Sequence, residues 1–353
     1  MREPHEVGRF HVFTAQISDG PSVSPRGHWF EDAREIATSR REVVFRGTRA
    51  LLRGAVRTSS LDDTTNHEQR PALTQKREVE KEWRDPRVTA AYRKWDRDES
   101  EWGRAARDFI IDRAQLAPRM RVLDVGSAHG EPGIAIAEVV GTGGHVTLFD
   151  LAPDLLEIAV ERARGAGLSN VAARAGDAHE LPFPDNTFDR LTSRLAAMYF
   201  ADCPRAFREA LRVLKPGGMA VYLVWGAFEQ PMFRDIIGVL FKYVSPPDDE
   251  PGAPSPFTFS ETGRLSQALA SAGFVDVREE SATLPTTFPG TPERWWEWLV
   301  DTAAPVQTWL GSLVASDREK ALEEIHQALR RFQDGDRVNV PIDVIVASGK
   351  KSA

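Results

Sequence analysis

The chain has 353 residues, 41% of them apolar, which is enough to build one large domain or two smaller ones. Its net charge of −7 gives no global reason to expect a nucleic-acid partner, and no apolar run approaches the ~20 residues that span a bilayer. Its one cysteine, Cys203, excludes intramolecular disulfides and cysteine-cluster metal sites, and we expect no metal. The opening MREPHEVGRF has no apolar core and does not resemble a secretory signal, so we expect a cytoplasmic protein.

Residues 1–75 form an N-terminal extension whose composition differs from that of the remaining chain. The stretch from Arg40 to Arg57 holds six arginines against a single acid, Glu42, with apolar residues near helical spacing. One interpretation is a basic surface that contacts a partner, and the other is a poorly ordered or accessory extension. The Pro-, Gly- and Ser-rich opening favours the second interpretation.

Residues 76–118 predict a helical segment. Asp85 followed by Pro86 is typical of an N-cap and the first position of a helix. The segment carries many aromatic side chains, among them Trp83, Tyr92, Trp95, Trp102 and Phe109. Aromatic residues at helical spacing are compatible with covering a ligand, although packing in the core is the more frequent use of such a pattern.

Residues 119–226 alternate strands with helices, which indicates a parallel sheet covered on both faces. The stretch from Arg121 to Gly133 predicts a buried strand, a loop of small residues and the start of a helix. Further strands are expected over 145–150, 171–175 and 186–193, with a helix from Arg205, the turn LKPGG and a fifth strand that ends near Trp225. Gly126, Asp150, Asp177 and Arg194 all lie at or just after strand ends, where α/β sheets bind ligands.

These motifs, RVLDVGSAHGEPG, HVTLFD, AGDAHELPFP and LKPGG, resemble those of the class I S-adenosylmethionine (SAM) methyltransferases. The similarity is greatest to the ubiquinone/menaquinone-type small-molecule subgroup with its methyltransferase type 11-like domain, and it spans roughly Arg104 to Trp225 with a looser tail to Lys350. The resemblance implies a Rossmann-like α/β fold with a seven-stranded, mostly parallel sheet and an antiparallel last strand. It also implies a helical N-terminal cover and helical substrate-lid insertions.

The resemblance implies SAM as the cofactor, held by residues that follow the first four strands. Asp124, Gly126 and Gly130 would border its methionine part, Asp150 the ribose hydroxyls, and Asp177 with the backbone of Ala178 the adenine. The full set of expected contacts is Asp124, Gly126, Ser127, Ala128, Gly130, Asp150, Leu151, Asp177, Ala178 and Arg194. Ala128 stands at the family's central loop glycine, and an alanine keeps the loop if its φ is negative. The G-x-G-x-x-G and Walker patterns are absent, which argues against NAD and P-loop nucleotides.

Residues 227–353 are predicted to supply the insertions that select the methyl acceptor and the strands that complete the sheet. The expected elements are an apolar helical run over 226–244, a helix over 260–273 with Ser260 as its N-cap, a strand over 273–279, a tryptophan-rich segment over 291–310, an amphipathic helix over 317–332 and a last strand over 340–351. By the resemblance, that last strand lies antiparallel beside the fifth.

Methyl transfer from a sulfonium is an in-line displacement, so the protein mainly binds, orients and excludes water. A general base helps only when the acceptor must lose a proton. The catalytic candidates are His179, Arg194 and Tyr199, although helix capping for His179 and packing for the other two remain alternatives. The residues expected to contact the acceptor are Tyr92, Trp95, Met198, Tyr199, Trp225 and Trp296.

The sequence narrows the class of acceptor. The N/D-P-P-Y/F tetrapeptide of amino-methyltransferases is absent after the fourth strand, where the chain reads SRLAAM. The aromatic insertions favour a small hydrophobic organic acceptor, such as a quinone-like compound, a polyketide or another specialised metabolite. A nucleic-acid methyltransferase that uses the basic stretch and a non-catalytic SAM-binding regulatory protein remain alternatives, and a homodimer is compatible with the sequence.

Overall fold

The computed structural model of this protein describes residues 79–245 and 254–353. The predicted N-terminal extension, including the basic stretch over 40–57, lies outside the described residues. Within the part of the chain that is described, no helix combines the length and the apolar character needed to cross a membrane.

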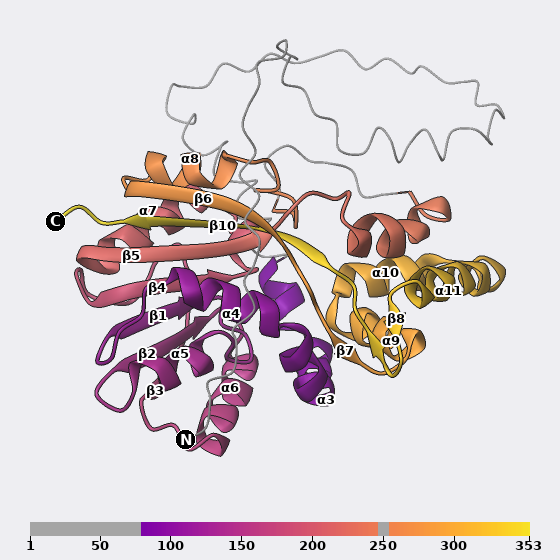
Figure 1. Cartoon of the computed structure of the whole chain (residues 1–353), viewed down its shortest axis with the longest axis horizontal. Coiled ribbons are helices and arrows are strands. Elements are labelled where there is room, and N and C mark those ends of the chain that lie inside the picture. The colour runs from indigo at the N-terminus through magenta and orange to yellow at the C-terminus, as the bar shows by residue number, and fades with distance from the viewer. Residues whose placement is uncertain (1–78, 246–253) are drawn as a thin grey trace, which may run out of the picture.

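A seven-stranded sheet organises the described residues, in the order β3-β2-β1-β4-β5-β10-β6 (Figure 1). β1 to β5 pair in parallel, whereas β10 runs antiparallel between β5 and β6. This topology confirms the predicted Rossmann-like class with an antiparallel last strand. The strands are β1 (Arg121–Val125), β2 (His145–Asp150), β3 (Val171–Ala175), β4 (Phe188–Arg194), β5 (Leu214–Trp225), β6 (Val275–Leu284) and β10 (Ile342–Lys350).

Helices follow the strands and cover the sheet. They are α5 (Gly133–Val140), α6 (Pro153–Gly165), α7 (Cys203–Val213) and α8 (Arg264–Ser271). Two further helices, α3 (Pro86–Trp102) and α4 (Arg104–Arg113), precede β1. Asp85 Oδ1 accepts a hydrogen bond from the Arg87 amide at 2.8 Å, which confirms the predicted cap before Pro86.

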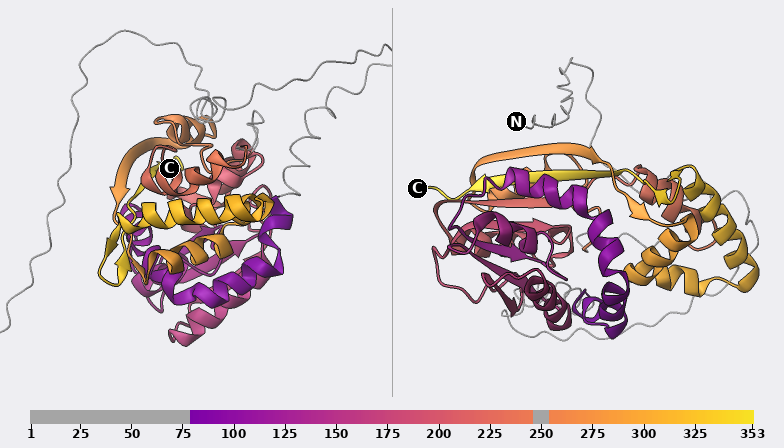
Figure 2. Two further views of the ribbon diagram at one scale, coloured as in Figure 1. Left: turned by 90° about the vertical axis from the view of Figure 1, so that its right-hand side faces the viewer. Right: turned by 60° about the horizontal axis from the view of Figure 1, so that its bottom comes forward.

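A group of helices stands beside one end of the sheet (Figure 1). It comprises α9 (Pro292–Thr302), α10 (Ala304–Ser312) and α11 (Ala315–Arg330), and α3 packs against α9 although the two are far apart in the sequence. In the left panel of Figure 2, α11, α9 and α3 lie one above another. The sheet and this helical group therefore share a boundary, and the predicted helical cover forms part of it.

Two predicted helices differ from the observed structure. The apolar run over 226–244 forms a π-helical turn η2 (Met232–Ile236) and a 3-10 segment η3 (Ile237–Lys242), because its apolar side chains are buried on several sides rather than along one helical stripe. The helix expected from Ser260 begins at Arg264, and Ser260 Oγ instead donates to the Phe257 carbonyl at 2.9 Å. The Glu279 carboxylate of β6 accepts from the Gly263 and Ser266 amides, so the cap comes from a neighbouring strand.

A small second sheet lies outside the sequence prediction. It consists of β7 (Phe288–Pro289), β8 (Gln333–Asp334) and β9 (Arg337–Val338), with β9 in the middle. Strands of two residues are too short to show an alternating apolar pattern, which explains why the sequence does not reveal them.

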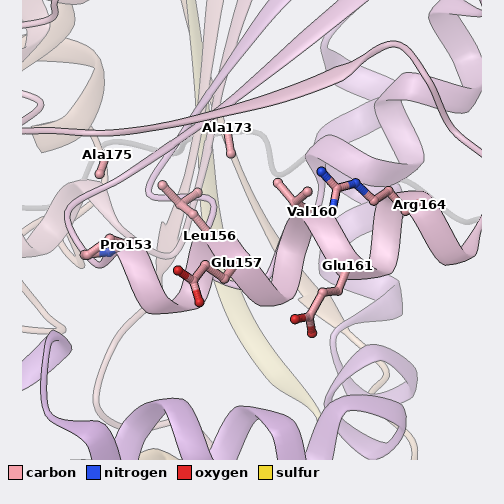
Figure 3. A pocket seen from close by; sticks show the side chains of 8 residues that line it. All are labelled: Pro153, Leu156, Glu157, Val160, Glu161, Arg164, Ala173 and Ala175. Atoms are coloured by element: carbon pink, nitrogen blue, oxygen red, sulfur yellow. The ribbon is translucent and has the colours of Figure 1, made fainter.

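A surface hollow of about 430 Å³ lies between α6 and the edge strand β3 (Figure 3). Leu156 and Val160 face β3, whereas the carboxylates of Glu157 and Glu161 point away from that strand. Glu161 is also paired with Arg93 Nη1 at 2.6 Å. No set of polar groups converges on this hollow among the residues that line it, so we do not assign it a ligand.

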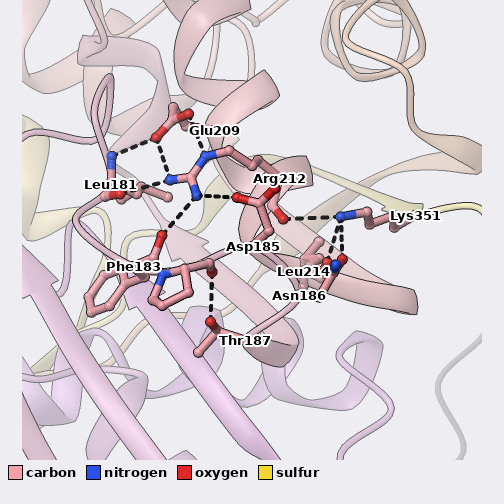
Figure 4. A network of polar contacts seen from close by, with 10 residues as sticks. Leu181, Phe183, Asp185, Asn186, Thr187, Glu209, Arg212, Leu214 and Lys351 are labelled. Carbon is pink, nitrogen blue, oxygen red and sulfur yellow. Dashed lines mark hydrogen bonds and ion pairs between the residues drawn. The ribbon is translucent and has the colours of Figure 1, made fainter.

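The connection from β3 to β4 is fixed by Arg212 of α7 (Figure 4). Its guanidinium donates to the carbonyls of Leu181 and Phe183 and to the carboxylates of Asp185 and Glu209, each at 2.8 Å. Glu209 also accepts from the Leu181 amide at 2.8 Å. The network holds the chain between the end of β3 and the start of β4, which contributes to the site described below.

Replacing Arg212 is therefore expected to destabilise the protein. Arg212→Ala should lower the free energy of unfolding by about 2 kcal/mol, because two backbone carbonyls and two carboxylates would lose the hydrogen bonds that Arg212 donates to them. Arg205→Ala, on the same helix, is the matched control, since its half-exposed side chain pairs weakly with Glu180 at 3.7 Å. That control should stay within about 0.5 kcal/mol of the parent in urea unfolding. Equal losses in the two variants would contradict this account of the network.

Candidate active site

Asp124 anchors the first strand, the loop after it and the following helix. Its side chain is fully buried; Oδ1 accepts from Thr192 Oγ1 at 2.7 Å and Oδ2 accepts from the Gly133 amide at 3.0 Å. Burial raises the pKa of Asp124 to about 7, against the opposing effect of these hydrogen bonds. The carboxylate thus joins β1, β4 and α5 behind the loop.

The loop after β1 holds three residues of positive φ, and the first two of them fix its start. Gly126 has φ +72°, and a Cβ there would lie 2.3 Å from the Ala196 Cβ, so this position excludes any side chain. Ala128 has φ +44°, which differs from the negative φ that we expected of an alanine at this position. Its amide donates to Asp150 Oδ2 at 2.8 Å, and this bond helps to hold a conformation that costs an alanine about 1 kcal/mol.

Asp150 links the ends of β1 and β2. Its Oδ2 accepts from the Ala128 amide and its Oδ1 from the Ala152 amide, both at 2.8 Å. Burial raises the pKa of Asp150, whereas the hydrogen bonds from Ala152 and Ala128 lower it. Asp150 also lines a large cavity at the carboxyl ends of the parallel strands, so one carboxylate both holds the loop and faces this cavity.

A cavity of about 640 Å³ opens at the carboxyl ends of the parallel strands, where the order switches from β1 to β4. Most of the predicted site residues line it. They are Gly126, Ala128, Asp150, Leu151, Asp177, Ala178 and Arg194 of the expected cofactor set, together with His179, Tyr92, Tyr199 and Trp225. The convergence that was expected from the strand-end positions of Gly126, Asp150, Asp177 and Arg194 is present in the structure.

Six predicted site residues are not part of the cavity wall. Besides Asp124, the loop residues Ser127 and Gly130 do not line it. Trp95 is only 1% exposed; its Nε1 donates to Asp301 Oδ2 at 2.8 Å and its ring packs against Phe288. Met198 and Trp296 are likewise buried in the hydrophobic core. These three side chains thus pack in the core around the cavity, whereas the sequence analysis expected them to contact the acceptor.

A buried polar group closes one part of the cavity. The His129 ring packs against Tyr92 at 4.9 Å between centroids, and burial, together with Arg162 and Arg194, holds the pKa of His129 well below its usual value. Glu131 Oε1 pairs with Arg162 Nη2 at 3.1 Å, and Arg194 Nε donates to the Glu131 carbonyl at 3.4 Å. Both nitrogens of His129 and Oε2 of Glu131 have no hydrogen-bond partner in the described structure. These buried polar atoms fit a charged or polar ligand group.

His179 is held by hydrogen bonds at both ring nitrogens. Nδ1 contacts Asp177 Oδ1 at 2.5 Å, and Nε2 accepts from the Asp202 amide at 3.0 Å. Because the amide can only donate, Nε2 supplies the lone pair and Nδ1 carries the proton. A ring that already uses its lone pair has none free for a substrate proton, so this geometry argues against His179 as the predicted base and favours a role in orienting Asp177.

Much of the remaining cavity wall is aromatic. Trp102 lies 4.9 Å from Trp298 and 6.2 Å from Trp225, measured between ring centroids, and Trp225 lies edge-on to Phe233 at 5.4 Å. The other aromatic lining residues include Phe228, Phe241, Phe257 and Trp309. The sequence analysis gave no site role to the phenylalanines or to Trp298 and Trp309. The apolar run over 226–244 and the tryptophan-rich segment were the signals that could have indicated them.

Comparisons with known proteins identify the chain. A family model described as a methyltransferase domain matches residues 116–226. The demethylmenaquinone methyltransferase of Staphylococcus aureus is 35% identical over 173 residues, which cover 46% of this chain and 71% of that relative. The chain belongs to the class I SAM-dependent methyltransferases of the quinone type. It is an enzyme whose cofactor is S-adenosylmethionine.

Two solved structures resemble this methyltransferase over 70% of its length. The YcgJ protein of Bacillus subtilis has 22% sequence identity and a TM-score of 0.47, with 98% of its own chain covered. A putative methyltransferase of Bacillus halodurans has the same identity of 22% and TM-score of 0.47, with 99% of its chain covered.

Ala128 offers a direct test of the loop geometry in this methyltransferase. Ala128→Gly should raise the free energy of unfolding by up to about 1 kcal/mol and preserve the affinity for SAM, because glycine adopts positive φ without strain. Ala152→Gly is the matched control, since Ala152 has φ −97°, and it should be destabilising. Ala128→Val should weaken SAM binding at least ~10-fold, because β-branched residues rarely adopt positive φ. Urea unfolding and calorimetric titration measure these effects, and equal destabilisation by both glycine substitutions would contradict the assigned backbone.

His179 is expected to influence cofactor binding rather than proton transfer. His179→Ala should weaken SAM binding about fivefold, equivalent to ~1 kcal/mol for the lost bond to Asp177. The dependence of kcat on pH should keep its shape, because Nε2 is already used by the Asp202 amide. A fall in kcat of ~10²-fold or more with loss of a pH-dependent limb would instead support a general base.

Proposed function

We propose that this methyltransferase transfers the methyl group of SAM to the reduced, hydroquinone form of a quinone-like acceptor. The observation that carries the proposal is the single cavity in which a polar part beyond β1 to β4 continues into an apolar part lined by Trp102, Trp225 and Trp298. An aromatic wall of this kind suits a flat hydrophobic ring. The relative named demethylmenaquinone methyltransferase supports the same class of acceptor.

The polar part of the cavity suits SAM. In the proposed arrangement Asp150 accepts hydrogen bonds from the ribose hydroxyls, and Asp177 with the backbone of Ala178 contacts the adenine. The methionine end lies against Arg194, His129 and Glu131, and the buried polar atoms of the last two need a polar partner. The negatively charged groups in this part of the cavity also favour a cationic sulfonium over a neutral ligand.

The same proposal assigns roles to the segments of the chain. Residues 119–226 bind SAM, residues 76–118 cover the site, and residues 227–353 bind the acceptor and complete the sheet. Residues 1–75 are an accessory extension in this scheme. The alternative of nucleic-acid methylation depends on the stretch 40–57, and no observation on the described residues favours it.

SAM supplies an electrophilic methyl group, so the reaction needs no covalent enzyme intermediate. The residues of the chain have three tasks: they bind the two reactants in one cavity, align them and exclude water. Arg194 lies at the end of β4, beside the polar part, and Tyr199 follows it in the turn η1 (Ala197–Tyr199). Burial and the charge of Glu82 raise the pKa of Tyr199, so its phenol stays protonated and can donate a hydrogen bond.

The proposal predicts methyl transfer from labelled SAM to a reduced 2-substituted 1,4-naphthoquinone under anaerobic conditions. Phe228→Ala should raise the KM for that acceptor about tenfold, equivalent to ~1.4 kcal/mol, and leave the Kd for SAM unchanged. Phe109→Ala is the control, because Phe109 is also a partly buried aromatic residue but does not line the cavity. Absence of transfer to reduced naphthoquinones by a protein that binds SAM would overturn the proposed acceptor.

A further inference from the structure

The helical turn over 79–83, immediately before α3, contributes a carboxylate to the cavity. Val79, Glu82 and Trp83 all line it. The Trp83 ring lies edge-on to that of Tyr199, with 6.2 Å between centroids, so the turn sits over the segment that follows β4. Glu82 therefore belongs to the wall of the cavity near Tyr199, whose pKa its charge helps to raise. The sequence analysis assigned it no role.

Glu82 differs from the other acids that line the cavity because its carboxylate has no hydrogen bond or ion pair with any residue that the structure describes. Asp150 accepts from two backbone amides, Asp177 contacts His179, and Glu131 pairs with Arg162. On the same helical turn, Glu80 pairs with Arg84 at 2.9 Å, outside the cavity. Among the described residues, both oxygens of Glu82 are therefore available to a ligand, whereas Glu131 has one oxygen engaged by Arg162.

The basic and phenolic groups that face the cavity are poorly suited to accept a proton. His129 is buried beside Arg162 and Arg194, which disfavour a further positive charge. His179 uses its lone pair to accept from the Asp202 amide. Arg194 is a cation without a lone pair to offer. Tyr199, like Tyr92 on α3, is a phenol, and the pKa of Tyr199 is raised by burial and by Glu82.

Burial also affects Glu82 itself. Removal from water raises the pKa of Glu82 above its usual value. A carboxylate of raised pKa binds a proton more readily near neutral pH and is a better base than an exposed glutamate. The shift agrees with the position of the residue in the cavity.

We propose that Glu82 is the general base that accepts the proton lost by the methyl acceptor. This inference rests on the proposed function, because a hydroquinone must lose a proton to become a strong nucleophile. The hydroxyl proton moves to a Glu82 oxygen, and the electron pair released into the ring forms the new bond from a ring carbon to the methyl carbon. The hydrogen on that ring carbon then moves as a proton to the ring oxygen, which restores the aromatic ring. The carbon–sulfur pair remains on sulfur, so S-adenosylhomocysteine leaves as a neutral thioether and one proton is left on Glu82.

The kinetic test compares Glu82→Gln with Glu80→Gln under anaerobic conditions, with reduced naphthoquinone as the acceptor. Glu82→Gln should lower kcat ~10²-fold or more with the Kd for SAM unchanged, and the control should match the parent. In the parent, kcat should rise with pH through the pKa of Glu82, because the base must be ionised. That limb should be absent in Glu82→Gln and retained, at lower kcat, in Glu82→Asp.

A binding measurement tests the same residue without methyl transfer. With S-adenosylhomocysteine present, 2-naphthol should quench the tryptophan fluorescence of the cavity, and its affinity should rise with pH as Glu82 ionises. Glu82→Gln should bind 2-naphthol with an affinity independent of pH over that range. If Glu82→Gln does not fold, the affinity for 2-naphthol is compared between the parent and Glu82→Asp. An affinity of the parent that does not change with pH overturns the proposal.

The outcomes separate the two proposals. No methyl transfer by the parent to any reduced naphthoquinone refutes the acceptor class. Transfer by the parent that survives Glu82→Gln with unchanged kcat and pH profile refutes Glu82 as the base and leaves the acceptor class intact.

Discussion

The site depends on the two hydrogen bonds that the buried carboxylate of Asp124 accepts. This carboxylate accepts hydrogen bonds from Thr192 in β4 and from the first amide of α5, and so joins three elements within one fully buried contact. The loop from Gly126 to Glu131 starts at the strand that Asp124 anchors and ends where α5 begins. The course of this loop then depends on the close approach of Gly126 to Ala196 and on the hydrogen bond from the Ala128 amide to Asp150. A change at Asp124 would therefore displace the polar wall of the cavity without touching any ligand.

The cavity combines two chemically different surfaces from distant parts of the chain. The polar surface comes from the residues that follow β1 to β4, as in other doubly wound sheets with a ligand at the switch point. The aromatic surface comes from segments after β5 and from α9 and α10, which pack with α3 beside the end of the sheet. Methyl transfer needs a charged cofactor and an electron-rich acceptor in contact and away from water. A polar surface that continues directly into an aromatic one meets this need.

The sequence predicted the central strands of the parallel sheet well because β1 and β2 are buried, and buried strands leave continuous apolar runs. β2 and β3 have the predicted bounds, and the antiparallel β10 was implied by the family resemblance. The start of α8 was mispredicted because its cap comes from Glu279 in β6, a contact across space that no local pattern encodes. Similarly, the left-handed φ of Ala128 depends on the distant Asp150 carboxylate.

The aromatic residues show the limit of sequence patterns at the site. Trp95 and Trp102 lie two turns apart on α3, yet Trp95 packs against Phe288 in the core and Trp102 lines the cavity. His179 was a reasonable base from its position, and only the Asp202 amide at Nε2 reveals that its lone pair is used. Glu82 carries no motif at all; its interest comes from the absence of a partner among the described residues and from its place beside Tyr199.

The division of the cavity is tested most directly by a crystal structure with S-adenosylhomocysteine and a reduced naphthoquinone analogue bound together. The account predicts the adenosine beyond the ends of β2 and β3, with its ribose on Asp150, and the naphthalene ring among Trp102, Trp225 and Trp298. An acceptor ring bound outside that aromatic wall, or a nucleoside that does not contact Asp150, would contradict it.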